Sequence, residues 1–229
     1  ALGNRLSETS GEGHTTTYSY DSMNRVSSKK RPTGGETQYA YDATGSLAKE
    51  TDANGHSTNY VNDLYGRVTK RTLPNEAAYT YAYDALGRLT KQTGPQGLSK
   101  TYSYDVSGNL VKETDQSDRS NHYSYDKVGR LLTAKNALDL ETKYSYDALN
   151  RVVTESDADG NTSTYEYDVL GNLSKMTDAN GHSSSYGYDA NKKLVLYTDP
   201  NGQATAFKYD PLGRIIETVA PTGSKQSFS

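Results

Sequence analysis

The strongest constraint on the fold of this chain is a repeat that keeps its spacing throughout. Ten aspartates lie 21 residues apart without an insertion or deletion, at Asp21, Asp42, Asp63, Asp84, Asp105, Asp126, Asp147, Asp168, Asp189 and Asp210. A strict period of this length is typical of repeat architectures in which each unit packs mainly against its neighbours. The sequence therefore predicts identical units stacked side by side.

Two aromatic positions accompany each aspartate. The residue just before it is tyrosine in nine repeats, with Asn62 as the exception, and the residue three before it is tyrosine in nine, with Phe207 in the tenth. Strand residues separated by one residue point to the same face, so both tyrosines of each Tyr-x-Tyr share a face. These signature tyrosines are Tyr18, Tyr20, Tyr39, Tyr41, Tyr60, Tyr81, Tyr83, Tyr102, Tyr104, Tyr123, Tyr125, Tyr144, Tyr146, Tyr165, Tyr167, Tyr186, Tyr188 and Tyr209.

A turn signal follows each aspartate. The residue three positions later is glycine in seven repeats and Asn24, Asn150 or Lys192 in the others; the glycines are Gly45, Gly66, Gly87, Gly108, Gly129, Gly171 and Gly213. Asp-x-x-Gly predicts a type I turn that ends in a left-handed residue, with the aspartate side chain bonded to the backbone two residues on. An aliphatic residue lies five positions after every aspartate, and a second turn signal follows, as in residues 52–55.

Each repeat therefore predicts a β-hairpin with strands of about six residues. One such hairpin is marginal in water, so stability must come from stacking. The predicted fold is all-β: stacked antiparallel β-hairpin repeats of 21-residue period in a curved sheet, either a partial shell or a β-solenoid-like strip. Residues 1–229 are interpreted as a single array of about ten repeats that is truncated mid-repeat at both ends.

Composition narrows the choice of core and partner. Only 33% of the residues are apolar, and 21 tyrosines stand against two phenylalanines and no tryptophan, so the tyrosine columns, stacked in rows, are expected to form the buried face. A net charge of −3 argues against nucleic acid as a partner. The chain has no cysteine for thiolate metal sites or disulfides, and no apolar run of about 20 residues for membrane insertion.

The string Tyr83-Asp84-Ala85-Leu86-Gly87-Arg88-Leu89 resembles the YD-repeat, or Rhs-repeat, family, and the resemblance covers essentially the whole chain. That family includes bacterial polymorphic toxins, the C component of Tc toxins, wall-associated bacterial proteins and teneurins. The resemblance implies a strip of hairpins that spirals into a hollow shell around a toxic domain, or a structure presented outside the cell. Toxin members carry an autoproteolytic Asp-Pro-x-Gly-Leu element after the repeats, whereas residues 210–214 here are interpreted as an ordinary repeat turn.

Two features of the sequence could suggest metal binding, but both fit repeat positions better. The Asp157-Ala158-Asp159-Gly160-Asn161 string has glycine at the fourth position rather than the sixth that an EF-hand requires, so a turn aspartate is favoured over a calcium ligand. His14, His56 and His182 follow second-turn glycines and are interpreted as exposed turn residues. His14 and His56 are two repeats apart, and each repeat supplies two strands, so about four strands separate them. At roughly 4.8 Å per strand this is too far for both to bind one ion.

An arginine column raises a further candidate, a binding stripe for acidic glycans. It comprises Arg25, Arg67, Arg88, Arg130, Arg151 and Arg214, with Asn109 and Asn172 at the same position. The nearby acids Glu50, Glu113 and Glu155 favour local ion pairing instead. Rows of tyrosine could stack on sugar rings, but their expected burial makes this the second interpretation.

We therefore predict a structural repeat segment of a large secreted or surface protein, namely the encapsulating shell of a bacterial polymorphic toxin. The alternative is a cell-surface adhesion module that binds carbohydrate or a partner protein. No enzymatic activity, catalytic residue, metal or cofactor is predicted. The expected partners are the remainder of the parent chain, with further repeats and an enclosed toxin domain, together with glycans, and edge-to-edge self-association is expected as well.

Overall fold

The structure is a computed structural model that describes residues 3–228. In this range strands and turns alternate from one end to the other, and the sole helical element is the 3-10 turn η1 (Pro95–Gly97). The fold is all-β with 22 antiparallel strands, which confirms the predicted fold class. The contacts divide the chain into two compact units.

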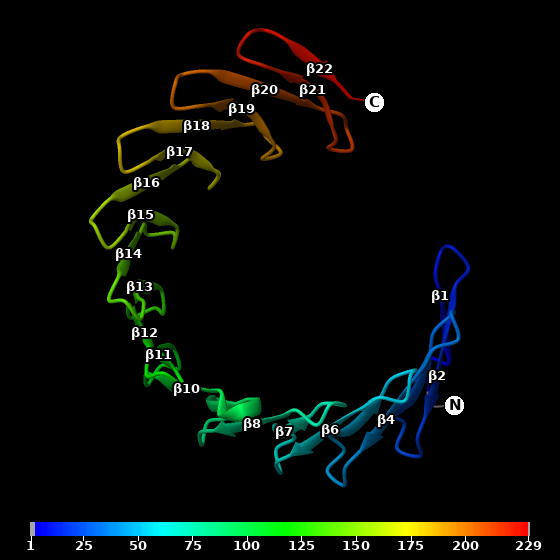
Figure 1. Ribbon diagram of the computed structural model, residues 1–229. Helices are drawn as coiled ribbons and strands as arrows, with labels where there is room; N and C mark the ends of the chain where they lie inside the picture. The colour runs from blue at the N-terminus through cyan, green and yellow to red at the C-terminus, as the bar shows by residue number, and fades with distance from the viewer. Residues whose placement is uncertain (1–2, 229) are drawn as a thin grey trace. The chain divides into compact units, whose positions relative to one another are not determined.

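Unit 1 comprises Ala1–Ser103 with Glu113–Arg119. Its consecutive strands pair with one another in chain order, from the first hairpin to the ninth strand and on to the start of the tenth (Figure 1). The strands are β1 (Ser7–Thr9), β2 (Thr15–Tyr20), β3 (Val26–Lys30), β4 (Glu36–Tyr41), β5 (Leu47–Thr51), β6 (Ser57–Asn62), β7 (Val68–Thr72), β8 (Ala78–Tyr83), β9 (Leu89–Thr93) and β10 (Ser99–Tyr104).

Unit 2 comprises Tyr104–Lys112 with Ser120–Ser229, and β11 (Leu110–Asp115) has residues in both units. From β12 onward each strand again pairs with the next, and within this unit the hairpins follow a curved path (Figure 1). The strands are β12 (Ser120–Tyr125), β13 (Leu131–Lys135), β14 (Glu141–Tyr146), β15 (Val152–Ser156), β16 (Thr162–Tyr167), β17 (Leu173–Thr177), β18 (Ser183–Tyr188), β19 (Leu194–Thr198), β20 (Ala204–Tyr209), β21 (Ile215–Val219) and β22 (Lys225–Ser227).

The turns have the predicted backbone. In the β8–β9 hairpin the Gly87 amide donates to the Asp84 carbonyl at 3.0 Å, and the Asp84 amide donates to the Arg88 carbonyl at 2.9 Å. Gly87 has φ +84°, which is the left-handed region that glycine adopts without a Cβ clash. Asn24 and Asn150 take the same conformation, at φ 61° and 65°, and so does Lys192 at 64°.

A register shift just after each Tyr-x-Tyr-Asp turn decides which side chains share a face. Ala82 pairs with Lys91 but Tyr83 pairs with Leu89, so Thr90 is an extra residue on the second strand. Such a bulge re-aims the side chains that precede it. Leu89 therefore lies on the same face of the sheet as Tyr81 and Tyr83, which we call the tyrosine face. Lys91 lies on the opposite face.

No side chain in residues 3–228 is fully buried. The signature tyrosines are half-buried, because nothing in the described chain covers the tyrosine face of these single-layer units. The expectation of a buried aromatic face is therefore wrong. The hairpins are held instead by backbone ladders and by side-chain contacts between successive repeats.

Candidate functional site

The turn aspartates bind their own backbone, and six of the ten repeat aspartates also bind the arginine four residues on. The Asp84 Oδ1 accepts hydrogen bonds from the amides of Leu86 and Arg88, both at 2.9 Å, and its Oδ2 accepts one from the Arg88 Nε at 2.7 Å. These bonds close the turn and fix the arginine side chain along it. The same pairing joins Arg25, Arg67, Arg130, Arg151 and Arg214 to Asp21, Asp63, Asp126, Asp147 and Asp210.

These hydrogen bonds lower the pKa of the turn carboxyls that an arginine binds. For Asp84 the main cause is the backbone N–H of Arg88, followed by its guanidinium. Asp42 has no arginine, yet the Thr44 hydroxyl and the Asn62 amide lower its pKa to about 2. The carboxylate form of these turns is thus the form that the fold stabilises.

The arginine also contacts the next repeat. The Arg151 guanidinium carbon lies 4.4 Å from the centre of the Tyr167 ring, which is within the range of a cation–π interaction. The Tyr167 hydroxyl reaches past it and donates to the Val152 carbonyl at 2.8 Å. Aspartate, arginine and the following tyrosine therefore form one brace between successive repeats, which we call the repeat brace.

The repeat brace recurs along both units. The cation stacks on the ring in the pairs Arg25–Tyr41, Arg67–Tyr83, Arg130–Tyr146, Arg151–Tyr167 and Lys193–Tyr209, at 4.3–5.3 Å. The hydroxyl-to-carbonyl bond is present in each of these repeats, with Val26, Val68, Leu131, Val152 and Leu194 as acceptors. Arg25, Arg67, Arg130 and Arg151 thus bind both their own turn aspartate and a tyrosine of the next repeat, which favours a structural role for these members of the arginine column.

Between one pair of successive repeats, two members of the repeat brace are different residues. Ser46 stands where arginine is usual, and Asn62 stands where the following tyrosine is usual. The Asn62 amide donates to the Leu47 carbonyl at 2.9 Å, which is the acceptor a tyrosine hydroxyl would use, and to Asp42 Oδ2 at 3.0 Å, where an arginine would bind. A single asparagine therefore substitutes for both contacts.

The prediction that the arginines form ion pairs with Glu50, Glu113 and Glu155 is wrong. Glu50 pairs across the strands with Tyr39 and Glu155 with Tyr144, while Glu113 binds Lys100 at 2.6 Å. Each glutamate stands eight residues after a repeat aspartate. In the hairpin this position lies opposite the first tyrosine of the same repeat, so Glu50 and Glu155 are on the tyrosine face. Within residues 3–228 the arginines of the column pair with the aspartates of their own turns and not with these glutamates.

Two tyrosines flank Glu155 on the tyrosine face. The Tyr165 hydroxyl donates to its carboxylate at 3.2 Å, and Tyr144 is its cross-strand neighbour. Partial burial, and then the charge of Glu155, raise the pKa of both phenols. This cluster combines two half-exposed rings with a carboxylate, a set of groups that can contact a polar ring-shaped ligand.

The contact that joins successive repeats is the repeat brace, in which a cation covers the ring, in place of the expected stacking of equivalent tyrosines. A close ring pair within residues 3–228 is Tyr186–Tyr197, with centroids 5.4 Å apart, and Tyr197 belongs to neither signature column. Equivalent tyrosines lie two strands apart, roughly 9.6 Å, with an intervening strand between them. Arginine and glutamate side chains from that strand occupy the space.

The other candidate residues are turn residues. Asp157 accepts bonds from the amides of Asp159 and Asn161, at 2.9 Å each, which is the turn role favoured above. His14, His56 and His182 are exposed, as predicted, and His56 and His182 lie 3.2 Å from a turn aspartate. In residues 3–228 no group of three or more acidic or histidine side chains is arranged to hold a metal.

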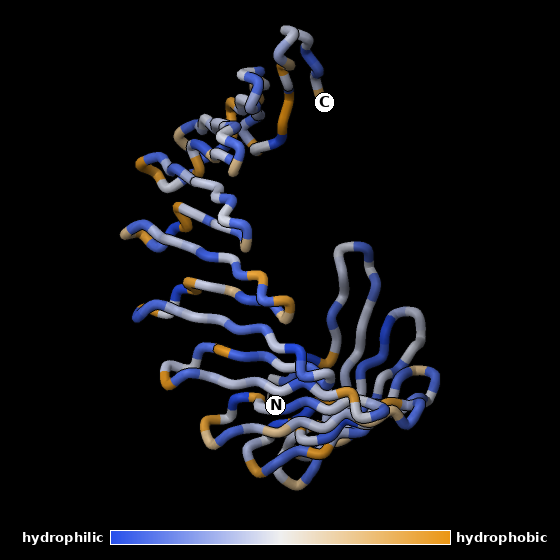
Figure 2. The backbone as a smooth tube through the Cα atoms, turned by 60° about the vertical axis from the view of Figure 1, so that its left-hand side comes forward, coloured by the Kyte–Doolittle hydropathy of each residue, from blue (hydrophilic) through white to orange (hydrophobic). Residues whose placement is uncertain are grey.

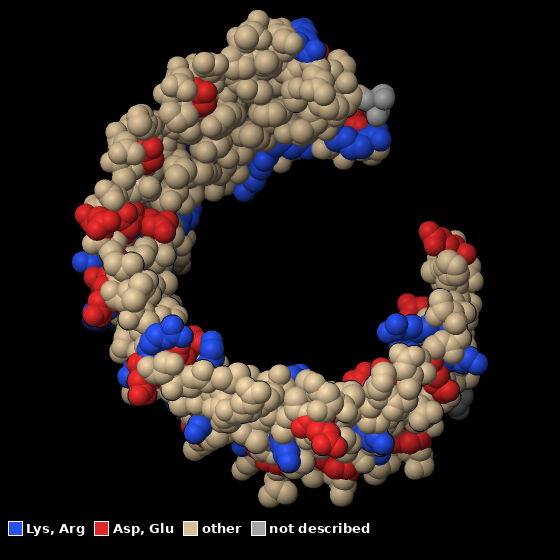
Figure 3. Space-filling view, viewed as in Figure 1, with Lys and Arg blue, Asp and Glu red and all other residues tan. Residues whose placement is uncertain are grey.

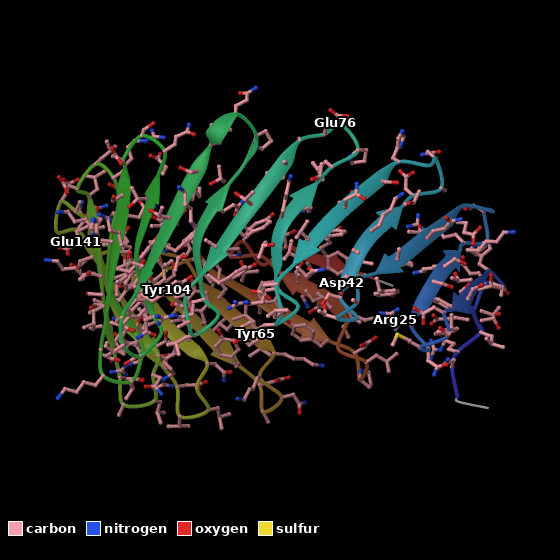
Figure 4. All side chains as sticks on the ribbon, turned by 90° about the horizontal axis from the view of Figure 1, so that it is seen from below. Arg25, Asp42, Tyr65, Glu76, Tyr104 and Glu141 are labelled. Carbon is pink, nitrogen blue, oxygen red and sulfur yellow. The ribbon has the colours of Figure 1, made fainter. Side chains whose placement is uncertain are left out.

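The two turn edges differ in polarity. The turns that begin with the repeat aspartate carry exposed apolar residues at their tips: Met23, Leu64, Tyr65, Leu86, Val106, Val128, Leu149, Val169, Leu170 and Leu212. The turns on the other edge carry mainly polar side chains, with Leu98, Leu138 and Leu140 as exceptions. Figure 2 shows the apolar turn tips, and Figure 4 places Tyr65 and Glu76 at opposite edges of the sheet.

Sequence reasoning missed two features. The repeat brace links positions 16 residues apart in neighbouring repeats, and the joint change at Ser46 and Asn62 was its signal. A row of lysines on the face opposite the tyrosines was also missed, although its 21-residue spacing is visible. In Figure 3, acidic and basic side chains alternate over much of the face in view.

Stacked 21-residue hairpins, closed by Tyr-Asp turns and joined by a brace from each repeat to the next, define a class of structural repeat proteins. The chain belongs to the RHS repeat family: the family model described as RHS Repeat matches residues 1–36, 63–99, 83–120, 125–162, 146–183 and 188–225. No curated protein matches the chain. None of the helical structure in residues 3–228 has the length and apolar character needed to cross a membrane.

Solved structures share the fold at low sequence identity. The crystal structure of TcdB2-TccC3-Cdc42 matches with a TM-score of 0.64 and 17% identity, over 97% of this chain and 16% of the other. TcdB2-TccC3 without its hypervariable C-terminal region matches with 0.64 and 17%, over 97% and 15%. The Photorhabdus luminescens Tc holotoxin pore matches with 0.56 and 13%, over 91% and 15%. The chain thus spans less than a fifth of these proteins.

Proposed function

We propose that this chain is a wall segment of a larger shell in a secreted or cell-surface toxin-type protein, and that its repeats do no chemistry themselves. The observation that carries the proposal is the row of exposed apolar tips on one turn edge. Leu86 is 77% exposed and Leu149 is 71% exposed, in turns whose geometry needs neither side chain. Apolar side chains repeated along an edge favour coverage by another part of a protein.

The fold supports this assignment. Structures of TcdB2-TccC3 contain the same arrangement of hairpins within chains about six times longer. In a longer strip of this kind, the apolar edge of one segment would be covered by other parts of the parent chain. The remainder of that chain and an enclosed toxin domain are then the natural partners.

Thiol labelling tests the proposal, because the chain has no cysteine of its own. Leu149→Cys places a thiol on the apolar edge, and Ala158→Cys places one on the polar edge. In the isolated chain we expect maleimide to modify both. In the full-length protein we expect modification of Leu149→Cys to be slower by at least about tenfold, the effect of burying a reactive group in an interface. Equal rates for Leu149→Cys in the two forms would contradict the shell and favour an exposed rod.

The open tyrosine face supports a second candidate, adhesion to carbohydrate. Tyr144, Glu155 and Tyr165 present two half-exposed rings and a carboxylate on one surface. Aromatic faces combined with a polar group are suited to sugar rings. Binding on a glycan array that Tyr165→Ala abolishes, with Thr164→Ala on the opposite face as control, would support this candidate, and absence of binding would oppose it.

A further inference from the structure

Unit 1 carries a row of unpaired lysines on the face opposite its tyrosines. Lys49, Lys70 and Lys91, here called the lysine row, occupy the same register position in β5, β7 and β9, and all three are exposed. Each lies directly across from the residue between the two columns of signature tyrosines, which fixes its face. Alternate strands place successive lysines roughly 9.6 Å apart.

None of these lysines has a carboxylate beside it. Among the ion pairs of residues 3–228, none includes a member of the lysine row. Their cross-strand neighbours are Ala40 and Asn59 for Lys49, Val61 and Thr80 for Lys70, and Ala82 and Thr101 for Lys91. The three ammonium groups therefore lack any internal counter-ion.

The same column in unit 2 shows what a paired lysine looks like. Lys175 lies across from Glu166, and its Nζ is 3.2 Å from the carboxylate. Glu217 and Lys208 form the reversed pair at 2.8 Å. The hairpin geometry therefore permits an ion pair at this register position, and the lysine row lacks the facing acid that would form one.

The surroundings of the lysine row are small or hydroxylated. Thr51, Thr72 and Thr93 lie on the same face, two residues further along the same strands. Ala82 on β8 lies between the strands of Lys70 and Lys91, and Ala40 on β4 lies beside Lys49 at the other end of the row, so the backbone is little covered at both places. Hydroxyls can donate to an anion, and the low alanine positions let an extended chain approach the backbone.

We propose that the lysine row binds an extended acidic polypeptide segment that carries a carboxylate side chain at every third residue. A polyproline II segment has three residues per turn and rises about 9.3 Å per turn, so such carboxylates project from one side at nearly the spacing of the lysines. An α-helix does not match, because roughly 9.6 Å corresponds to about 6.4 of its residues.

Charge balance favours this occupant over a dense polyanion. The chain has a net charge of −3, so no long-range field concentrates a highly charged polymer at the surface. Recognition must then come from local contacts in register, and three isolated ammonium groups suit a segment with sparse, regularly spaced charges. The proposal is independent of whether the chain forms part of a shell.

Fluorescence anisotropy with a labelled peptide of four Glu-Pro-Pro triplets tests the proposal at about 50 mM salt, where screening is weak. We expect binding by the unmodified chain and a loss of affinity of at least about tenfold in Lys49→Gln/Lys70→Gln/Lys91→Gln. Ala40→Glu/Ala82→Glu places carboxylates opposite Lys49 and Lys91, as Glu166 lies opposite Lys175. These lysines would then be paired internally, so binding of the peptide should weaken similarly. Lys175→Gln is the matched control and should change affinity less than about twofold.

Several results would overturn the proposal. Equal binding by the triple lysine variant, or an equal loss in Lys175→Gln, would show that the lysine row is not the site. Equal binding of a peptide with its four glutamates in succession would show that register plays no part. Binding of dextran sulfate to the lysine row without binding of the Glu-Pro-Pro peptide would assign the surface to anionic polysaccharide. Circular dichroism of each variant checks that the sheet is intact.

Discussion

The joint exception at Ser46 and Asn62 allows the repeat brace to be measured by restoring it. Ser46→Arg and Asn62→Tyr together recreate the arginine and tyrosine of the other repeats, while either change alone leaves the brace incomplete. Asn62→Tyr loses two amide hydrogen bonds and regains one to Leu47, a net cost of about 1 kcal/mol. Ser46→Arg gains a solvent-screened ion pair with Asp42, but the arginine competes with Asn62 for that carboxylate.

In the double variant the guanidinium gains an aromatic face, worth about 0.5–1 kcal/mol, and the competition for Asp42 ends. We therefore expect a favourable coupling free energy of about 1 kcal/mol, roughly a fivefold change in the unfolding equilibrium constant. Urea denaturation followed by circular dichroism measures the unfolding free energy of the unmodified chain, of each single variant and of the double variant, which together form a double-mutant cycle. Pairing Ser46→Arg with the distant Asn201→Tyr is the control and should be additive within about 0.3 kcal/mol. The same additivity for the Ser46–Asn62 pair would refute the brace as an energetic unit.

Three further predictions concern turns and edges. Lys192→Gly should stabilise the chain by about 0.5–1 kcal/mol in urea, because a lysine at φ 64° is strained; no gain would oppose this. Asp84→Asn should lower the melting temperature at pH 7, and the difference from the unmodified chain should shrink below pH ~4, since a depressed carboxyl pKa gives stability that is lost as pH falls through it; a constant difference would contradict this. The outer edges of β1 and β22 should promote self-association at high concentration, and a strictly monomeric species in light scattering would oppose it.

The turns could be predicted from the sequence because their causes are local. An Asp-x-x-Gly string contains the carboxylate, the amides it binds and the residue that adopts positive φ, as at Asp84 and Gly87. The hairpins and their 21-residue period followed directly. The tyrosine partner of each brace arginine could not be predicted this way, since Arg151 and Tyr167 meet only when two repeats stack in a particular register.

The burial of the tyrosines was mispredicted for a physical reason. Composition showed that tyrosine is the main large apolar side chain available, but the degree of burial depends on what covers the face. A single layer of hairpins buries one side of each ring against its neighbours and leaves the other accessible. The charged residues between the rings, such as Glu155 beside Tyr165, fit this half-exposed environment.

The final prediction asks whether unit 2 behaves as a stack of neighbours or as one cooperative body. Tyr167 and Tyr209 occupy the same column, each with its hydroxyl 2.8 Å from a carbonyl of the preceding repeat and a cation over its ring. Because the rings are half-buried, truncation to alanine should cost about 2–3 kcal/mol rather than the 3–5 of a packed core. Tyr209 lies in the last complete hairpin, so Tyr209→Ala should fray that end and leave the main transition nearly unchanged. Tyr167→Ala should interrupt the stack, and so lower the urea midpoint or split the transition. In Tyr209→Ala, hydrogen exchange should show that amide protection is lost only beyond residue 209. In Tyr167→Ala, protection should be lost on both sides of residue 167. Equal shifts of a single sharp transition would mean that contacts beyond nearest neighbours stabilise the unit, and the description of the repeats as a linear array would be wrong.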